Sequence, residues 1–194
     1  MGRELFAGPS FRALEIGEED LPALQRFFDE NPAYFLAVGG EGPHPDQARE
    51  EFGGRPPADW LWDGKWLIRF VDEGGETIAV ADVMSNLLAR GVWHIGLFIV
   101  ATRMHGDGSA KVMYGELESW MRRGGARWSR LGVAVGNARA ERFWERAGYV
   151  EARRREGVAI GRRVNTMRVM VKPLAGEGVP GYLEQVPRDR PGSP

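Results

Sequence analysis

The sequence of 194 residues contains no cysteine, only three histidines and no long apolar run. Without cysteine the chain forms neither a disulfide nor a thiolate metal site, and this composition suits a reducing compartment. His44, His94 and His105 lack the spacing of a metal site, so we expect no bound metal. No segment has the apolar length of a membrane span or of a signal peptide. We therefore expect a cytoplasmic protein without a membrane partner.

Neither sign of charge is in excess. The 26 basic and 27 acidic residues give a net charge of -1, which provides no overall positive field for a phosphate backbone. On this ground we expect no nucleic-acid partner. Arginine-rich segments at residues 153–155 and 162–163 leave an alternative open, because such runs either bind an anionic partner or shield an exposed strand with solvated charge.

The length and the hydrophobic content suit one domain, which we place at residues 1–174. Alternating apolar residues predict strands, and apolar residues three or four apart predict helices. The predicted strands span residues 11–16, 65–71, 76–84, 92–100, 128–135, 149–155 and 165–171, and the predicted helices span residues 20–31, 46–52, 109–123 and 137–147. The fold class is therefore α/β (α+β), with a mixed, mostly antiparallel central sheet flanked by helices. After Pro173 glycine and proline recur with few apolar residues, so we expect a flexible tail over residues 175–194.

The segment Gly96–Ser109 combines a buried strand, a glycine-containing loop and the start of a helix. The first turn of a helix has free N–H groups, and glycines allow a close approach of the main chain to an anion. A Rossmann fingerprint would require glycine where Lys111 stands, and the Gly-Lys-Ser/Thr of a P-loop is absent. The alternative to an anion site is an ordinary strand-to-helix turn that Asp107 or Ser109 caps.

Two motifs in order resemble those of the GNAT superfamily of acyltransferases. Arg103-x-x-Gly106-x-Gly108 resembles the pyrophosphate-binding signature, and residues 137–149 resemble the second signature, Asn-x-x-Ala-x-x-Phe-aromatic-x-x-x-Gly-aromatic. The resemblance covers about residues 11–174. It implies a sheet that is splayed between its two central strands, with acetyl-CoA as the cofactor bound in the opening.

The resemblance also implies which residues hold the cofactor. Pantetheine is expected along the strand that contains Phe98 and Val100, with Asn137 near the cofactor arm. The pyrophosphate is expected on the backbone amides of one stretch: Arg103, Met104, His105, Gly106, Asp107, Gly108 and Ser109. Met104 departs from the family pattern because glycine is common there. Asp107 adds a carboxylate beside the phosphates, which repels them unless the side chain turns away to cap the helix.

Acetyl transfer to an amine requires a base, because an alkylammonium is protonated at neutral pH. A turn centred on Leu88 pairs Asp82 with His94 across two strands, and a histidine oriented by an aspartate is a suitable base. We therefore predict His94 and Asp82 as the catalytic pair. The alternative is a half-buried polar pair without a catalytic role, and a register shift of one residue separates the two side chains.

Trp144 occupies the place in the second signature where a tyrosine often protonates the departing thiolate. An indole N–H donates a hydrogen bond but no proton, so Trp144 is counted with the cofactor-binding residues. Tyr114 and Tyr149 are the alternative proton donors, although amphipathic surroundings also suit them to core packing. The remaining alternative is that the coenzyme A thiolate departs without a proton donor.

The acceptor side has a weaker signal. Five aromatic residues lie near five acidic residues, and together they suit either a pocket for a cationic amine or an aromatic core under an acidic loop: Tyr34, Phe35, Trp60, Trp62 and Trp66, with Asp46, Glu50, Glu51, Asp59 and Asp63. The predicted function is acetyl-CoA-dependent N-acetylation of a primary amine by direct attack in a ternary complex. The alternative function is a CoA-binding module without turnover. The acceptor and the oligomeric state stay open, with a homodimer as one alternative.

Overall fold

A computed structural model describes residues 2–193 of the chain. The strands are β1 (Glu4–Gly8), β2 (Phe11–Glu15), β3 (Gly64–Val71), β4 (Thr77–Ser85), β5 (Val92–Val100), β6 (Trp128–Ala134), β7 (Val150–Ile160) and β8 (Arg163–Pro173). The α-helices are α1 (Leu21–Glu30), α2 (Ala33–Gly39), α3 (Gln47–Gly53), α4 (Ser109–Arg123), α5 (Ala138–Arg146) and α6 (Val179–Gln185). Short 3-10 turns are η1 (Glu18–Asp20), η2 (Thr102–Met104) and η3 (Pro187–Asp189). None of the helices within residues 2–193 combines the length and the apolar character needed to cross a membrane.

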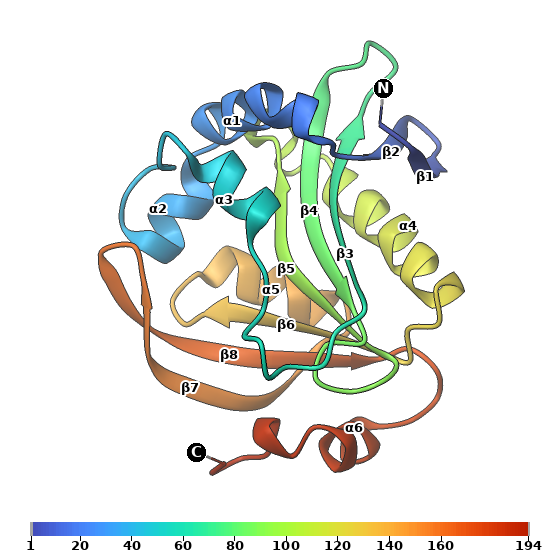
Figure 1. Ribbon diagram of the computed structural model, residues 1–194, viewed down its shortest axis with the longest axis vertical. Coiled ribbons are helices and arrows are strands. Elements are labelled where there is room, and N and C mark those ends of the chain that lie inside the picture. Colours follow the sequence, from blue (N-terminus) through green and yellow to red (C-terminus); the bar gives the residue numbers. More distant parts are fainter. Residues whose placement is uncertain (1, 194) are drawn as a thin grey trace.

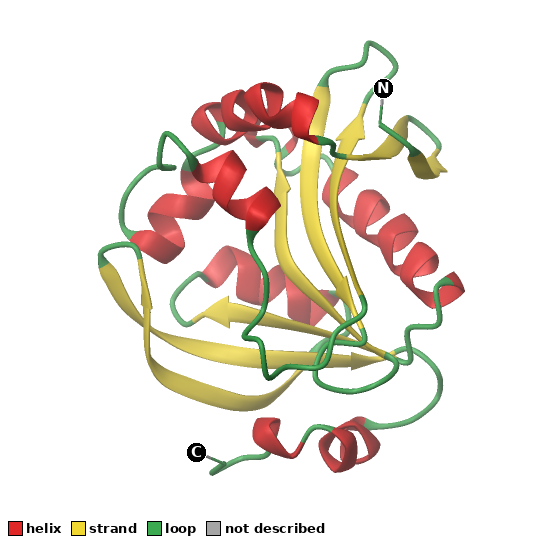
Figure 2. Cartoon of the chain, viewed as in Figure 1, coloured by secondary structure: helices red, strands yellow, loops and turns green. Residues whose placement is uncertain are grey.

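All eight strands form one sheet in the order β1-β2-β3-β4-β5-β6-β8-β7. Neighbouring strands are antiparallel except β5 and β6, which are parallel. Figure 1 shows the sheet with helices on both faces, and Figure 2 separates the helices from the strands by colour. The predicted fold class, a mostly antiparallel sheet flanked by helices, is confirmed.

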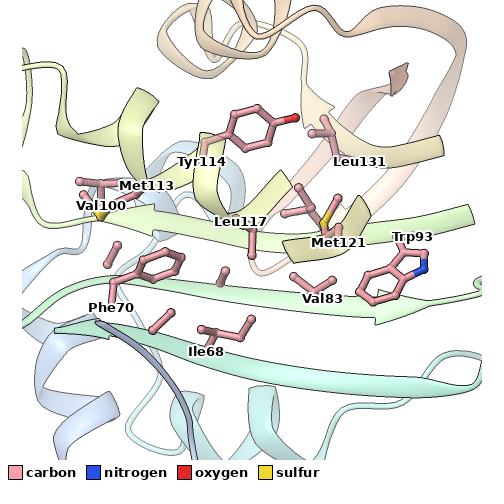
Figure 3. Packing of buried hydrophobic residues seen from close by; sticks show 14 of the residues in the cluster. Ile68, Phe70, Val83, Trp93, Val100, Met113, Tyr114, Leu117, Met121 and Leu131 are labelled. Carbon is pink, nitrogen blue, oxygen red and sulfur yellow. The ribbon is translucent and has the colours of Figure 1, made fainter. Parts of the chain in front are cut away.

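Both faces of the sheet carry apolar side chains, because successive residues of a strand point to opposite faces. A layer of helices packs on each face. Helices α1, α2 and α3 cover one face through a single cluster: Leu24, Phe27, Phe28, Phe35 and Ala48, packed on Leu67, Val80, Leu97 and Ile99. Helix α4 covers the other face, with α5 beside it, through a second cluster that Figure 3 shows in part: Met113, Leu117, Met121 and Trp144, packed on Ile68, Phe70, Val83, Ile95 and Leu131.

Strands β5 and β6 pair over only four residues and then diverge. The pairing ends where Ile95 lies opposite Leu131. Strand β5 continues to pair with β4 on its other side, but Gly96 is an extra residue, since Val83 pairs with Ile95 and Asp82 with Leu97. This bulge bends β5 at the residue where it leaves β6. The predicted splay between the two central strands is confirmed, and Figure 1 shows the opening with α5 behind it.

Strand β1 and helix α2, both before β3, escaped the sequence prediction. Strand β1 is a five-residue edge strand with an irregular register against β2, so its alternation is too short to detect. Helix α2 was missed because Asn31-Pro32 was interpreted as a stop signal. Helix α1 ends at Glu30 with Asn31 as its C-cap, and Pro32 is already the N-cap residue of α2.

The segment after Leu174 is folded in the structure, whereas the sequence predicted a flexible tail over residues 175–194. Pro180 lies in the first turn of α6, where the missing N–H is no loss. The helix and the residues after it pack beneath the sheet through Tyr182 and Val186, which are buried with Trp128 and Val171. Figure 1 shows this segment in red below β7 and β8. Glycine and proline content therefore indicated turns here, not disorder.

Candidate active site

A groove lies at the divergence of β5 and β6. It encloses about 500 Å³ and is bounded by β5, the turn before α4, α2 and α5. Eight of the eleven residues predicted to hold the cofactor line it: Phe98, Val100, Met104, His105, Gly106, Gly108, Asn137 and Trp144. The other three predicted residues, Arg103, Asp107 and Ser109, lie in the adjoining turn and at the start of α4. Sequence signatures that are about thirty residues apart thus meet at one groove.

The turn between β5 and α4 presents unpaired backbone donors. Gly106 and Gly108 have φ angles of 95° and 90°, and a Cβ atom at either position would meet no atom within 4 Å. Within residues 2–193, the N–H groups of Gly106, Asp107 and Gly108 donate no hydrogen bond. The turn also precedes the N-terminus of the 15-residue helix α4. Open donors at a helix N-terminus bind anions, and no side chain plugs this turn.

Three side chains of the turn are engaged elsewhere. Oδ1 of Asp107 accepts a hydrogen bond from the Ser109 N–H at 2.8 Å, which lowers the pKa of Asp107. The Asp107 carboxylate therefore lies against the first N–H of α4. Nε2 of His105 lies 2.9 Å from the carbonyl oxygen of Val100, and Arg103 points toward the Thr77 carbonyl at 3.5 Å. A ligand at this turn would therefore contact backbone N–H groups more than side chains.

Basic side chains that the sequence analysis missed also line the groove: Lys111, Arg139, Arg142 and Arg146. The three arginines are three or four residues apart on α5, so they follow one face of the helix. That spacing was visible in the sequence after Asn137, whose side chain caps α5 by accepting from the Ala140 N–H at 3.3 Å. Open amides, glycines without obstruction and four cations fit the diphosphate and phosphate groups of coenzyme A.

The aromatic residues around Trp144 belong mainly to the core. Trp144 packs against Phe98, with ring centroids 5.9 Å apart, and lines the groove. The Tyr114 hydroxyl donates to Glu118 at 2.6 Å and lies 3.1 Å from the Tyr149 hydroxyl. Burial raises the pKa of both tyrosines, and neither lines the groove. The structure therefore gives Tyr114 and Tyr149 the packing role that the sequence left as an alternative.

The predicted pairing of Asp82 with His94 is wrong. His94 lies opposite Met84, and Asp82 lies opposite Leu97, because the Gly96 bulge and the turn between β4 and β5 shift the register. Nδ1 of His94 instead lies 3.3 Å from Nη1 of Arg130 on β6. Since arginine only donates, Nδ1 accepts, and the proton of the neutral ring is on Nε2. Burial, with the charge of Arg130, lowers the pKa of His94 to about 3, which makes His94 a poor base at neutral pH.

Asp82 has a different partner. Its Oδ2 lies 3.2 Å from Nζ of Lys65 on β3, and both side chains are buried. Glu51 on α3 joins this pair through its carbonyl oxygen, which accepts a hydrogen bond from Nζ of Lys65, and the charge of Asp82 contributes to raising the pKa of both Glu51 and Tyr34. Tyr34 also lines the groove. Of the ten residues proposed for the acceptor side, the structure brings Glu51 to Lys65 and Tyr34 to the groove.

The remaining aromatic residues on that side lie elsewhere. Trp66 stacks on Trp93 at 5.4 Å on the opposite face of the sheet, and Phe35 is part of the core under α1. Trp60 packs under the guanidinium of Arg188 at 4.0 Å. These residues stabilise the loop before β3 and the two cores. No single aromatic pocket of the predicted kind is formed by the described residues.

Comparisons with known proteins give one family. The sequence model described as the Acetyltransferase (GNAT) family matches residues 24–149. No curated protein matches the chain by sequence.

Solved structures resemble the fold at low sequence identity. An acetyltransferase from Thermus thermophilus superposes with a TM-score of 0.68 at 17% identity, over 89% of this chain and 100% of that one. The acetyltransferase from Salmonella typhimurium that modifies the N-terminal serine of ribosomal protein L7/L12 gives 0.70 at 13% identity, over 89% and 99% of the two chains. Spermidine N-acetyltransferase from Vibrio cholerae, solved with CoA and spermine, gives 0.65 at 16% identity, over 84% and 95%.

Proposed function

The chain belongs to the acetyltransferase (GNAT) family, and from this premise we propose that it transfers the acetyl group of acetyl-CoA to a primary amine by direct attack in a ternary complex. The family uses acetyl-CoA, and its members are acyltransferases. The observation that carries the proposal is the groove, where a free strand edge leads into a turn of unpaired amides.

The residues of the groove suggest how acetyl-CoA would be held. Backbone groups of β5 after Ile95 have no strand on the β6 side and would pair with the pantetheine arm. The amides of Gly106 and Gly108 would bind the diphosphate, and Lys111 with the arginines of α5 would neutralise phosphate charge. When bound, acetyl-CoA supplies the thioester whose acyl group is transferred. Since the diphosphate site lies beyond the C-terminal end of β5, the acyl end is expected near Gly96.

An amine acceptor is supported by what similar folds act on. One of the structures described above is a spermidine acetyltransferase and another modifies an N-terminal serine, and both substrates present an amine. The proposal involves no nucleic-acid or membrane partner. It is compatible with a homodimer, which light scattering after size-exclusion chromatography measures. A cytoplasmic location is part of the proposal, because a chain without cysteine suits a reducing compartment.

Two measurements test the proposal. Acetyl-CoA at saturating concentration should raise the melting temperature, because a ligand that binds only the folded state stabilises it. A panel of primary amines should then accelerate the release of free thiol from acetyl-CoA above the hydrolysis rate. Stabilisation without turnover of any amine would favour the CoA-binding module. The absence of any thermal shift would refute the cofactor site itself.

A further inference from the structure

A buried cluster of charged side chains lies behind the point where β5 leaves β6. Nζ of Lys65 is 3.2 Å from Oδ2 of Asp82, and the two side chains are 7% and 6% exposed. Nζ also donates to the carbonyl oxygens of Glu51 and Gly54. An ammonium group has three N–H donors, so these contacts occupy all of them. Lys65 is therefore a fixed internal cation with no donor left for a ligand.

Asp82 keeps one acceptor unused. Its Oδ1 is buried and has no hydrogen-bond partner in the part of the chain that the structure describes. A buried polar atom without a partner costs folding free energy, so such an atom calls for an explanation. Gly96 is exposed, and a Cβ atom at this position would lie 3.6 Å from Cγ of Asp82. The missing side chain thus leaves room beside the Asp82 carboxyl, at the divergence of the strands.

Glu51 brings a second carboxylate to the cluster. Its side chain accepts only a long hydrogen bond of 3.4 Å, from Nε2 of Gln47, among the described residues. Burial raises the pKa of Glu51 to about 7, with a further contribution from the charge of Asp82 and an opposing one from Lys65. Glu50 and Arg55 are the other charged groups that act on the two carboxylates. The guanidinium of Arg55 is engaged by the carbonyl oxygens of Phe52 and Gly54.

Tyr34 is a groove residue on which the charges of this cluster act. Its side chain lines the groove, and burial followed by the charges of Glu51 and Asp82 raises the pKa of its hydroxyl. The phenol therefore stays protonated at neutral pH. A molecule in the groove beside Tyr34 would therefore meet an uncharged hydroxyl.

We propose that Asp82 and Glu51 form the subsite for the acceptor ammonium, and that Glu51 takes up the proton which this ammonium must lose. The inference rests on the proposed function. It replaces the histidine base that the sequence suggested with a glutamate that the sequence placed only among the acidic residues of the acceptor side. Asp82, held by Lys65, orients the ammonium through its unused Oδ1.

The reaction balances with these groups. The ammonium R–NH3+ gives one proton to the Glu51 carboxylate, and the lone pair of R–NH2 then forms the N–C bond to the acyl carbon. The C–S bond breaks with its electron pair on sulfur, and the nitrogen loses a second proton, which neutralises the thiolate through solvent. Glu51 finally releases its proton to solvent and returns to the carboxylate form.

The same charges define the class of acceptor. Two carboxylates at the subsite attract an ammonium but repel a carboxylate of the substrate, which suppresses acceptors that carry one next to the amine. We therefore expect a preference for alkylamines, amino amides and other amines without a neighbouring carboxylate. Free α-amino acids should be poor substrates.

The decisive variant is Glu51→Gln, because the backbone carbonyl of Glu51 that Lys65 requires is retained. With the best amine of the panel at pH 7, we expect kcat/KM to fall by about a hundredfold or more. The rate of the wild type should rise with pH through the region near 7, and the variant should lose this step. The Kd of acetyl-CoA should stay within about twofold of the wild type. Glu184→Gln, which changes an exposed glutamate on α6 outside this cluster, is the control and should change neither value.

Each outcome separates the inference from the function on which it rests. If the wild type binds no acetyl-CoA or turns over no amine, the proposed function itself fails. If the wild type is active and Glu51→Gln keeps its kcat/KM, or loses acetyl-CoA binding, the inference alone is overturned. As a second measurement, alanine amide should be acetylated at least about tenfold faster than alanine at pH 8 when each rate is divided by the fraction of that amine which is uncharged. Equal rates for the two would contradict the subsite.

Discussion

Asp189 lies fully buried against Arg130, and its carboxylate oxygens accept from Nε and Nη2 of that arginine at 2.7 Å and 3.2 Å. Arg155 and the Tyr182 hydroxyl donate to the same carboxylate. Arg130 belongs to β6 and also contacts His94 on β5. One carboxylate near the end of the chain therefore ties the C-terminal segment to the middle of the sheet.

Asp189→Asn should lower the free energy of unfolding by about 3 kcal/mol at pH 7, because it leaves Arg130 buried without a counter-charge. Urea denaturation measures this, with the exposed Glu184→Gln on α6 as the control. Burial alone would raise the pKa of Asp189, but the hydrogen bonds and charge of Arg130 lower it. The stabilisation is thus present above the unfolded pKa of about 4 and is lost as the pH falls below it. Equal stability of variant and wild type at pH 7 would contradict the prediction.

Gly106→Ala and Gly108→Ala should weaken acetyl-CoA binding by about tenfold or more. A methyl group at either position would occupy the space through which the diphosphate approaches the amides. Isothermal titration calorimetry measures the Kd. Gly125→Ala is the matched control, since Gly125 also has a φ of 95° and open surroundings but lies beyond the far end of α4. It should lose stability through the same backbone strain and keep its affinity. Equal losses of affinity in all three variants would mean that strain alone is responsible.

His94 should remain neutral from pH 8 down to about pH 4, because the pKa of its imidazole is lowered to about 3 by burial and by Arg130. Nitrogen-detected NMR of the imidazole observes this directly, and His94→Gln identifies its signals. In acid the unfolded chain binds a proton at this residue below about pH 6.5, while the folded chain does not. The free energy of unfolding of the wild type should therefore decrease as the pH falls from about 6.5 to about 4, and it should decrease less in His94→Gln. A histidine signal that titrates near pH 6.5 and vanishes in the variant would refute the assignment.

Trp144 should report cofactor binding by fluorescence. Of the tryptophans within residues 2–193, it is the one that lines the groove. Acetyl-CoA should change the emission of the wild type with a saturating dependence on concentration. Trp144→Phe keeps an aromatic ring against Phe98 and should bind with similar affinity by calorimetry, but without the spectral change. A variant that binds and still gives the full signal would assign the effect to another tryptophan.

The parts of the fold that local spacing determines were predictable from the sequence. Helix α4 and strand β5 have the bounds that their apolar patterns predicted, 109–123 and 92–100. The groove that we propose for the cofactor was predictable through the resemblance to the GNAT superfamily, which the glycines at 106 and 108 and the asparagine cap at 137 carry.

The acceptor side was not predictable because it depends on non-local register. The turn between β4 and β5 pairs His94 with Met84 instead of Asp82, and the bulge at Gly96 moves Asp82 one residue further along β5, to Leu97. The contact of Lys65 with Asp82 requires the register between β3 and β4. Likewise, the folding of the C-terminal segment depends on the contact of Asp189 with Arg130, which lies 59 residues earlier in the chain.

The edge of β5 beyond Ile95 has a consequence for handling the protein. This unpaired edge belongs to a strand in the middle of the sheet and not to β1 or β7, the strands at its two ends. Such an edge is a template for strand addition by another chain, and natural proteins protect theirs. A pantetheine arm lying along β5 would occupy this template as a surrogate strand. Concentrated preparations kept with coenzyme A should therefore self-associate less than the ligand-free protein.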